Sequence, residues 1–159
     1  MNADRCEGCG RAVEGGTAGC RAEFEAMCGR DFGDVRYGRL HRMMVDTYSV
    51  QHPDAYCAST RSLIAHLGGL CCGMEFERQE NVYRALRLWI ERVGIAEKPP
   101  LPAARGDVTI ADALAAADPV AYADAVQRWA RSAWAAHASL HAVARHWIDE
   151  ALKLPAHKH

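Results

Sequence analysis

The stretch Arg5-Cys6-Glu7-Gly8-Cys9-Gly10, followed by Gly19-Cys20, decides how this chain is held together. Two cysteines separated by two residues, with glycine after the second, form a turn through which two thiolates bind one metal ion. The glycines let the backbone fold back so that its amides face the sulfurs. Residues 1–19 have little hydrophobic content and cannot order themselves by burial. The sequence therefore predicts a zinc knuckle over 1–19, with Cys6, Cys9 and Cys20 as three ligands.

Length and composition are those of an ordinary globular protein. The chain has 159 residues, half of them hydrophobic and a quarter charged, so we expect one helical domain over residues 1–159. A net charge of −1 gives no electrostatic reason to expect binding to nucleic acid or to an anionic membrane. No signal peptide and no apolar run of about 18 residues is visible. We therefore expect a cytoplasmic protein whose seven cysteines are reduced.

Apolar residues recur at helical spacing along most of the chain, and no stretch alternates as a strand does. We expect helices over 20–31 and 35–50, a third after Thr60 and a fourth closed by Gly94. A proline-rich loop follows over 97–108, and residues 109–154 form C-terminal helices, the longest running from Asp118-Pro119 to about Leu154. The predicted fold is all-α, an irregular bundle of about five to six helices with an N-terminal zinc knuckle. His157 and His159 are expected in a frayed tail.

Gly68-Gly69 lies inside the third predicted helix. Glycine in a helix interior lowers stability by up to about 1 kcal/mol relative to alanine. We therefore expect another helix to pack closely against this pair.

A closed zinc site needs a fourth ligand beside the three cysteines. If the first two helices form an antiparallel hairpin that turns near Gly33-Asp34, residues equidistant from the turn meet, and His52 falls beside Cys20. His41 would lie nearer Cys28, about 10 Å away along the helix axis. The predicted ligands are therefore Cys6, Cys9, Cys20 and His52, with His41 and Cys28 as reserve ligands. The alternative is that the cysteine pair is incidental or a redox dithiol.

Histidines on three predicted helices form a second candidate site. His41, His66 and His141 face inward, and together they would make an open metal site of the catalytic kind, with Asp46 orienting one of them. His137 precedes His141 by four residues, so both would lie on one helix face. The alternative is that each histidine is buried and hydrogen-bonded to a backbone carbonyl or to a side chain such as Asp46. Both interpretations stay open.

Several motifs of the chain together resemble a known family. They are Cys6-x-Gly-Cys-Gly, Gly19-Cys20, His41-Arg-x-x-Val-Asp-x-Tyr-x-x-Gln-His-Pro53 and His66-Leu-x-Gly-Leu70. In these the chain is similar to an uncharacterised bacterial family of small cytoplasmic proteins, and the similarity extends to the pattern Trp134…His141…Arg145-x-Trp147. The family has no assigned activity. The resemblance implies metal binding and a compact α fold, and it places on motif positions the residues His41, Asp46, His52, His66 and His141.

Three functions are compatible with these features. The first is a zinc-binding helical protein that acts as a binding or regulatory module, with Zn²⁺ as a structural cofactor. The second is a metal-dependent enzyme, a hydrolase or thiol transferase, that uses the histidine cluster. The third is a redox or metal sensor in which oxidation of Cys6 or Cys9 releases zinc. A protein partner or a small ligand fits the first of them, and neither nucleic acid nor a membrane is expected.

Overall fold

The computed structural model describes residues 4–92 and 97–155. Within these ranges six helices have seven or more residues, namely α1 (Gly16–Gly33), α3 (His41–Gln51), α5 (Thr60–Glu75), α6 (Glu80–Arg92), α8 (Pro119–Ala136) and α9 (His141–Leu152). The shorter elements are α2 (Val35–Gly38), α4 (Pro53–Tyr56), α7 (Ile110–Leu114) and the 3₁₀ turn η1 (Ala138–Leu140). These ranges contain no strand, only one antiparallel bridge between Arg5 and Ala12. The predicted all-α bundle is therefore confirmed.

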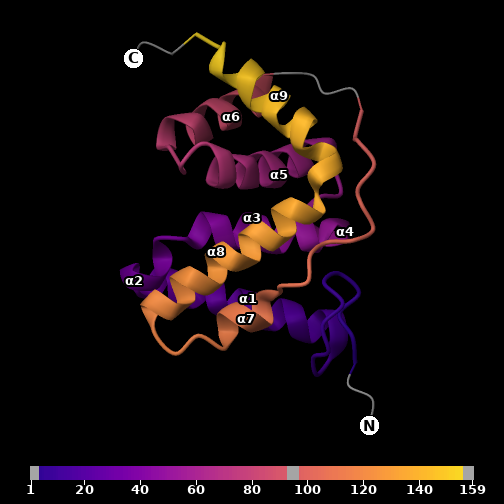
Figure 1. The fold of residues 1–159 in the computed structure, drawn as a ribbon, viewed down its shortest axis with the longest axis vertical. Coiled ribbons are helices and arrows are strands. Elements are labelled where there is room, and N and C mark those ends of the chain that lie inside the picture. The colour runs from indigo at the N-terminus through magenta and orange to yellow at the C-terminus, as the bar shows by residue number, and fades with distance from the viewer. Residues whose placement is uncertain (1–3, 93–96, 156–159) are drawn as a thin grey trace.

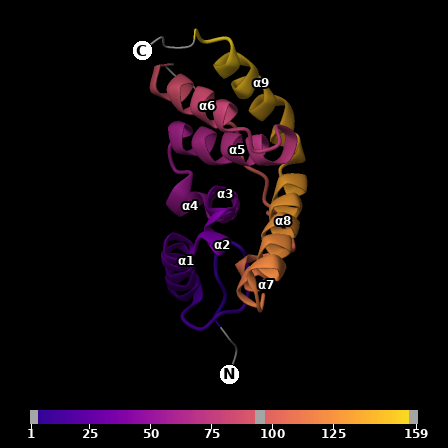
Figure 2. The ribbon, with the colours of Figure 1, turned by 90° about the vertical axis from the view of Figure 1, so that its left-hand side faces the viewer.

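The helices are arranged in two layers. In the first, α1, α3, α5 and α6 are stacked along the long axis of the molecule (Figure 1). In the second, α7, α8 and α9 run along one side of this stack (Figure 2). Helix α8 packs against α3 and α5, and α9 packs against α5 and α6. As a result α1 and α6 lie at opposite ends, joined through α3, α5 and the second layer.

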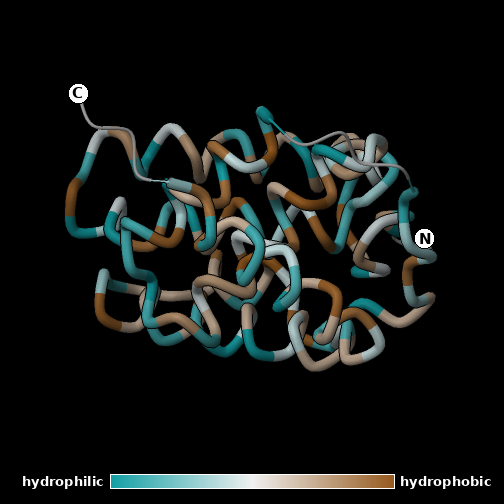
Figure 3. Tube along the Cα trace, turned by 90° about the horizontal axis from the view of Figure 1, so that it is seen from above, coloured by the Kyte–Doolittle hydropathy of each residue, from teal (hydrophilic) through white to brown (hydrophobic). Residues whose placement is uncertain are grey.

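The core lies between the layers and between successive helices of the stack. Hydrophobic and hydrophilic segments are interspersed along the trace (Figure 3), as expected for helices that bury one face and expose the other. Trp129 of α8 is fully buried, and Trp134 and Trp147 are nearly so. These tryptophans fill the core, as their positions on the predicted helix faces indicate.

The close packing predicted at Gly68-Gly69 is confirmed, and it involves two different helices. A Cβ atom on Gly68 would lie 2.8 Å from Cδ2 of Leu86 in α6. A Cβ atom on Gly69 would lie 2.2 Å from Oδ2 of Asp46 in α3. The two glycines therefore let α5 approach a neighbour on each side, which offsets their low helix propensity.

Two predicted helices are interrupted. The helix expected over 35–50 is divided at residues 39–40 into α2 and α3, and α1 begins at Gly16 rather than Cys20. The prediction of one uninterrupted helix from Asp118 to Leu154 is wrong, because α8 ends at Ala136 and α9 begins at His141.

Two histidine side chains bond to the end of α8 at the second interruption. Nδ1 of His137 donates to the carbonyl of Ala133 (2.7 Å), and Nε2 of His141 donates to the carbonyl of Trp134 (2.7 Å). The His141 ring also stacks on the Trp134 ring, with centroids 3.9 Å apart. The backbone amide of His137 also donates to the carbonyls of Ala133 (3.2 Å) and Trp134 (3.0 Å), so each side chain adds a second hydrogen bond to one of these carbonyls. The two imidazoles therefore reinforce the C-terminal end of α8 and do not line one helix face.

No helix within 4–92 or 97–155 combines the length and apolar character needed to cross a bilayer. The predicted end of the fourth helix near Gly94 lies outside the described residues. His157 and His159 lie outside them as well.

Candidate metal centre

Four side chains with metal-ligand chemistry meet beside the N-terminal part of α1. Cys6 and Cys9 lie in the loop before α1, Cys20 lies in its second turn, and His52 directly follows α3. Their ligand atoms all lie within 4.8 Å of one another. Among the residues that the structure describes, no other group of three or more Cys, His, Asp or Glu side chains is this close. The structure thus brings together the four residues expected as ligands, and their binding of a metal stays a prediction.

The loop is shaped so that its two cysteines face α1. The amide of Cys6 donates to the carbonyl of Arg11 (3.0 Å), and the amide of Gly10 donates to the carbonyl of Cys6 (2.9 Å). Gly10 has φ +78°, which a residue with a side chain rarely adopts. A Cβ atom on Gly8 would lie 2.2 Å from Cδ2 of His52. The glycines therefore allow the tight turn and the approach of its backbone to the imidazole.

Two of the six separations between the donor atoms match those around a tetrahedral zinc ion, and all six are within 4.8 Å. Sγ of Cys9 and Sγ of Cys20 are 3.9 Å apart, and Sγ of Cys20 and Nε2 of His52 are 3.6 Å apart. With zinc–sulfur bonds of about 2.3 Å and zinc–nitrogen bonds of about 2.0–2.1 Å, tetrahedral geometry places two sulfurs about 3.8 Å apart. The same geometry places sulfur and nitrogen about 3.6 Å apart. The donor set and its spacing fit Zn²⁺.

The hydrogen bonds of His52 give its ring the tautomer that a metal ligand needs. Nδ1 donates to the carbonyl of Tyr48 at 2.6 Å, so the proton lies on Nδ1. The lone pair of Nε2 is then directed toward the cysteine cluster. The His52 ring also stacks on the Tyr48 ring, with centroids 3.8 Å apart. Metal-bound histidines are commonly oriented by such a bond from the second ring nitrogen.

Tyr48 contacts two of the cluster residues, Cys20 and His52, a role that the sequence analysis did not assign. Its hydroxyl donates to Sγ of Cys20 (3.5 Å), and its ring stacks on Phe24 with centroids 3.9 Å apart. Burial raises the pKa of Tyr48, so the hydroxyl keeps its proton and remains a donor. Donation from the Cys9 thiol and the Tyr48 hydroxyl lowers the pKa of Cys20, which favours its thiolate. The spacing of four residues between Tyr48 and His52 is the signal that places both on one helix face.

Gln51 and Arg105 connect the site to the second layer, and neither was among the predicted residues. The side-chain amide of fully buried Gln51 donates to the carbonyls of Arg105 and Val108, both at 2.9 Å. Its oxygen accepts a hydrogen bond from Nε1 of Trp129 (2.8 Å). Nη1 of Arg105 donates to the carbonyl of Gly8 (2.9 Å). The cysteine loop, the end of α3 and α8 are therefore joined through two polar side chains.

The reserve ligands have other surroundings. Nδ1 of His41 donates to Oδ2 of the buried Asp31 (3.0 Å). Asp31 also accepts from the hydroxyl of Tyr122 (3.3 Å). Cys28 is half-buried, and burial, followed by the nearby carboxylate of Asp31, raises its pKa. Neither residue belongs to the four-residue cluster.

The histidines of the second candidate site are not brought together. Nδ1 of His66 donates to Oδ1 of Asp46 (3.0 Å), whereas His41 pairs with Asp31 and His141 bonds to the carbonyl of Trp134. Asp46 is buried, which raises its pKa, and it holds His66 in place as a hydrogen-bond acceptor. The three imidazoles therefore have separate hydrogen-bond partners, as the alternative interpretation of the sequence describes.

The buried cysteines outside the cluster are apolar in character. Burial is the main cause that raises the pKa of Cys57, Cys71 and Cys72, each to about 12. Their thiols stay protonated at neutral pH, so they are poor nucleophiles and poor metal ligands. They act as small core side chains.

Residues 4–138 match the model of a group described as "Family of unknown function (DUF5946)". The chain belongs to DUF5946. The predicted resemblance to an uncharacterised family is thereby confirmed, although the matched part ends before His141, Arg145 and Trp147. Neither the curated proteins nor the solved structures give a match. For this DUF5946 chain the arrangement of the four cluster residues is therefore the strongest indication of function.

Proposed function

We propose that the chain is a small helical zinc protein in which Cys6, Cys9, Cys20 and His52 bind one structural Zn²⁺, and that it acts as a binding or regulatory module. The observation that carries the proposal is the donor spacing of 3.9 Å and 3.6 Å, together with the tautomer of His52. When bound, the ion supplies cross-linking between the cysteine loop, α1 and the end of α3.

A structural role is favoured over a catalytic one. Three thiolates and one imidazole complete a tetrahedral zinc shell, whereas a catalytic zinc keeps one position for water or substrate. Cys6, Cys20 and His52 are also buried. The separate partners of His41, His66 and His141 leave the enzyme alternative without a second metal centre among the described residues.

The test is the zinc content of untagged protein, measured by elemental analysis for matched single variants. We expect about one zinc per chain in the wild type and little in Cys20→Ser or His52→Gln. Cys28→Ser and His41→Gln, which change the reserve ligands, are the controls and retain zinc. A wild type purified without metal and unable to take up zinc would overturn the proposal. Loss of zinc in a control variant, with retention in His52→Gln, would reassign the fourth ligand.

A redox sensor is the second candidate, favoured by the 3.9 Å separation of the sulfurs of Cys9 and Cys20. Cys9 is the partly exposed member of the cluster. A peroxide would oxidise one sulfur of this pair to a sulfenic acid, and attack by the other sulfur would then form a disulfide with release of water. In sum two thiols and one peroxide give one disulfide and two molecules of water, and the zinc leaves with its ligands lost.

Zinc release under mild peroxide separates the two candidates. A sensor releases its zinc within minutes at micromolar peroxide, and a thiol reductant restores binding. A purely structural site keeps its zinc under the same treatment, and Cys28→Ser behaves as the wild type in either case.

A further inference from the structure

Residues 97–108, which we call the strap, run along one edge of the molecule from the end that carries α6 toward α7 (Figure 1). Pro99, Pro100 and Pro102 have no amide hydrogen to donate. Among the residues that the structure describes, no backbone–backbone hydrogen bond joins the strap to another segment. The hydrogen bonds that fix its position therefore all involve a side chain, either of the strap or of the segments that it crosses.

Arg105 ties the strap to the cysteine end of the molecule. Its Nη1 donates to the carbonyls of Gly8 (2.9 Å) and Gln51 (3.4 Å). In return, the side-chain amide of Gln51 donates to the carbonyls of Arg105 and Val108. Gly8 lies in the cysteine loop, and Gln51 directly precedes His52. This anchor of the strap therefore rests on backbone that adjoins the proposed zinc ligands.

A second anchor lies on α8. The hydroxyl oxygen of Ser132 accepts hydrogen bonds from the amides of Asp107 (3.1 Å) and Val108 (3.2 Å). Gly106 permits this approach, since it has φ +100° and a Cβ atom on it would lie 2.8 Å from the same oxygen. Ser132 is not a member of the four-residue cluster. The strap can therefore be loosened at this anchor without a change in the cysteine loop.

The first anchor depends on an ordered cysteine loop. Nε of Arg105 is buried and has no hydrogen-bond partner among the described residues. Burial of a charged group is costly unless hydrogen bonds compensate for the lost water. Here two carbonyls compensate, and that of Gly8 makes the shorter bond. If the loop loses its order, the guanidinium loses this bond, which favours its return to water.

We propose that zinc occupancy controls the docking of the strap: the ion fixes the cysteine loop, the loop holds Arg105, and without the ion this anchor opens and the strap becomes mobile. The inference rests on the proposed zinc site. Coupling between two sites is reciprocal, so an undocked strap lowers zinc affinity by the factor by which zinc favours docking. A regulatory module of this kind presents one surface to a partner when zinc is bound and another when it is absent.

The test combines backbone ¹⁵N relaxation by NMR with zinc affinity from chelator competition, both on the full chain. In the zinc-loaded wild type we expect the heteronuclear Overhauser effect at residues 103–107 to match that of the helices. Removal of zinc should lower it there, while α5, α6 and α9 keep rigid values. Arg105→Gln should show the mobile strap with zinc still bound, and its zinc affinity should be weaker by about fivefold or more.

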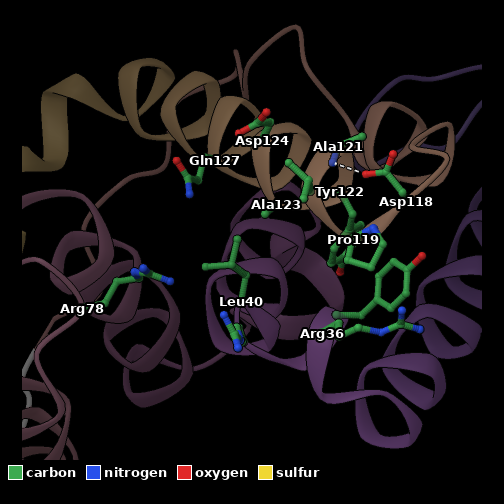
Figure 4. Close-up of a pocket in the computed structure, with 13 residues that line it drawn as sticks. Arg36, Leu40, Arg78, Asp118, Pro119, Ala121, Tyr122, Ala123, Asp124 and Gln127 are labelled. Carbon is green, nitrogen blue, oxygen red and sulfur yellow. Dashed lines mark hydrogen bonds between the residues drawn. The ribbon is translucent and has the colours of Figure 1, made fainter.

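Ser132→Ala is the more exacting variant, because it loosens the strap and leaves the cysteine loop unchanged. Reciprocity requires that it also weakens zinc binding, by less than Arg105→Gln does. The matched controls are Ser139→Ala and Arg78→Gln, both at exposed positions, which should behave as the wild type does. Arg78 lines a groove of about 830 Å³ between α2 and α8 that includes no strap residue (Figure 4).

The possible failures are distinguishable. A wild type that binds no zinc would overturn both the zinc site and the coupling, whereas bound zinc with equal strap mobility in the two states would overturn the coupling alone. Wild-type affinity in Ser132→Ala beside weakened affinity in Arg105→Gln would also overturn it, because Arg105 would then only support the loop. Loss of order throughout α5, α6 and α9 on zinc removal would have the same consequence, since the change would be global unfolding.

Discussion

The two ends of the stack are held together by different interactions. The cysteine end, residues 4–33 with Tyr48 to His52, begins with a segment over 4–15 in which only Cys6 and Val13 are buried. The leucine end, made of α5, α6 and α9, buries apolar side chains along every helix. At about 25 cal/mol for each Å² of apolar surface buried, the leucine end has a source of stability that the cysteine loop lacks.

Because of this difference, we expect the two ends to respond differently to changes in the solution. The leucine end depends on the packing of apolar side chains, which does not require a metal ion. The loop over residues 4–15 depends on a few polar contacts and on the proposed ion, so we expect its order to follow the supply of zinc. Changes aimed at one end at a time test whether the two ends depend on these different interactions.

Removal of the metal has the largest expected effect. Structural zinc contributes about 10–16 kcal/mol to the folding of zinc-finger peptides, so Cys20→Ser should leave residues 4–15 without order. We expect their amide hydrogens to exchange as in an unfolded chain, while α5, α6 and α9 stay protected. Hydrogen exchange with mass spectrometry measures both regions in one experiment. A chelator should reproduce the pattern in the wild type and Cys28→Ser should not, and uniform loss of protection along the chain would contradict the separation of the two ends.

Truncation of a core leucine tests the other end. Leu67 in α5 is 0% exposed, and Leu67→Ala should lower the free energy of unfolding by about 2–5 kcal/mol. Zinc content should stay at the wild-type value, because the change lies outside the cluster. Urea denaturation gives the energy, and Leu152→Ala, at a position 44% exposed, is the control with an effect within about 0.5 kcal/mol. A variant that lost zinc together with stability would show that the ends are coupled.

Gln51→Leu tests the junction between the ends. The change leaves the carbonyls of Arg105 and Val108 and the indole N–H of Trp129 without a buried partner. We expect a loss of about 2–3 kcal/mol, because each buried group without a partner costs about 1–3 kcal/mol and some regain water. Thermal unfolding followed by tryptophan fluorescence measures it. The exposed Gln79→Leu should be neutral, and a Gln51→Leu variant as stable as the wild type would exclude this role for the amide.

Tyr48→Phe has a smaller effect, confined to the cysteine end. It removes the hydroxyl that donates to Cys20 and keeps the ring that stacks on His52. Loss of such a supporting hydrogen bond should weaken zinc affinity about tenfold, which corresponds to about 1.4 kcal/mol. Competition with a chromogenic chelator measures the affinity. Tyr56→Phe, whose ring contacts Tyr48 edge-on, is the matched control, and equal affinities for both variants would contradict the role of the Tyr48 hydroxyl.

His137 gives the smallest effect, visible only in mild acid. Burial lowers the pKa of His137 below its usual value near 6.5, and the charges of Arg105 and His141 add to this. The unfolded chain therefore binds a proton that the folded chain excludes, so stability falls as the pH drops below about 6.5 toward the folded pKa. The slope from one group is at most about 1.4 kcal/mol per pH unit. Urea denaturation from pH 7.5 to 5.5 should show a shallower slope for His137→Gln, and equal slopes would contradict the assignment.

Local patterns in the sequence were enough to predict the helical fold and the position of His52 beside Cys20. Periodic apolar residues define the helices, and the hairpin argument depends only on the spacing from the turn at Gly33-Asp34. It holds although the second helix is divided, because α2 and α3 together still return the chain past α1. The cysteine motif marks the loop without any knowledge of tertiary structure.

Features that depend on distant contacts were not predictable in this way. Gln51 bonds to groups 54, 57 and 78 residues away, and nothing in its neighbours indicates them. The pairs His41–Asp31 and His66–Asp46 depend on which helix faces meet. The break between α8 and α9, where His137 and His141 bond to carbonyls of α8, is marked by no proline or glycine in the sequence.

The order of the proposed ligands along the chain has a consequence for synthesis on the ribosome. All four ligands precede α4 along the chain, so the ion has its complete set of donors before α5, α6, α8 and α9 are made. The amide of Gln51, by contrast, must wait for residues 105–129. The proposed metal-binding end could therefore fold first during synthesis, and the later helices would then pack against it.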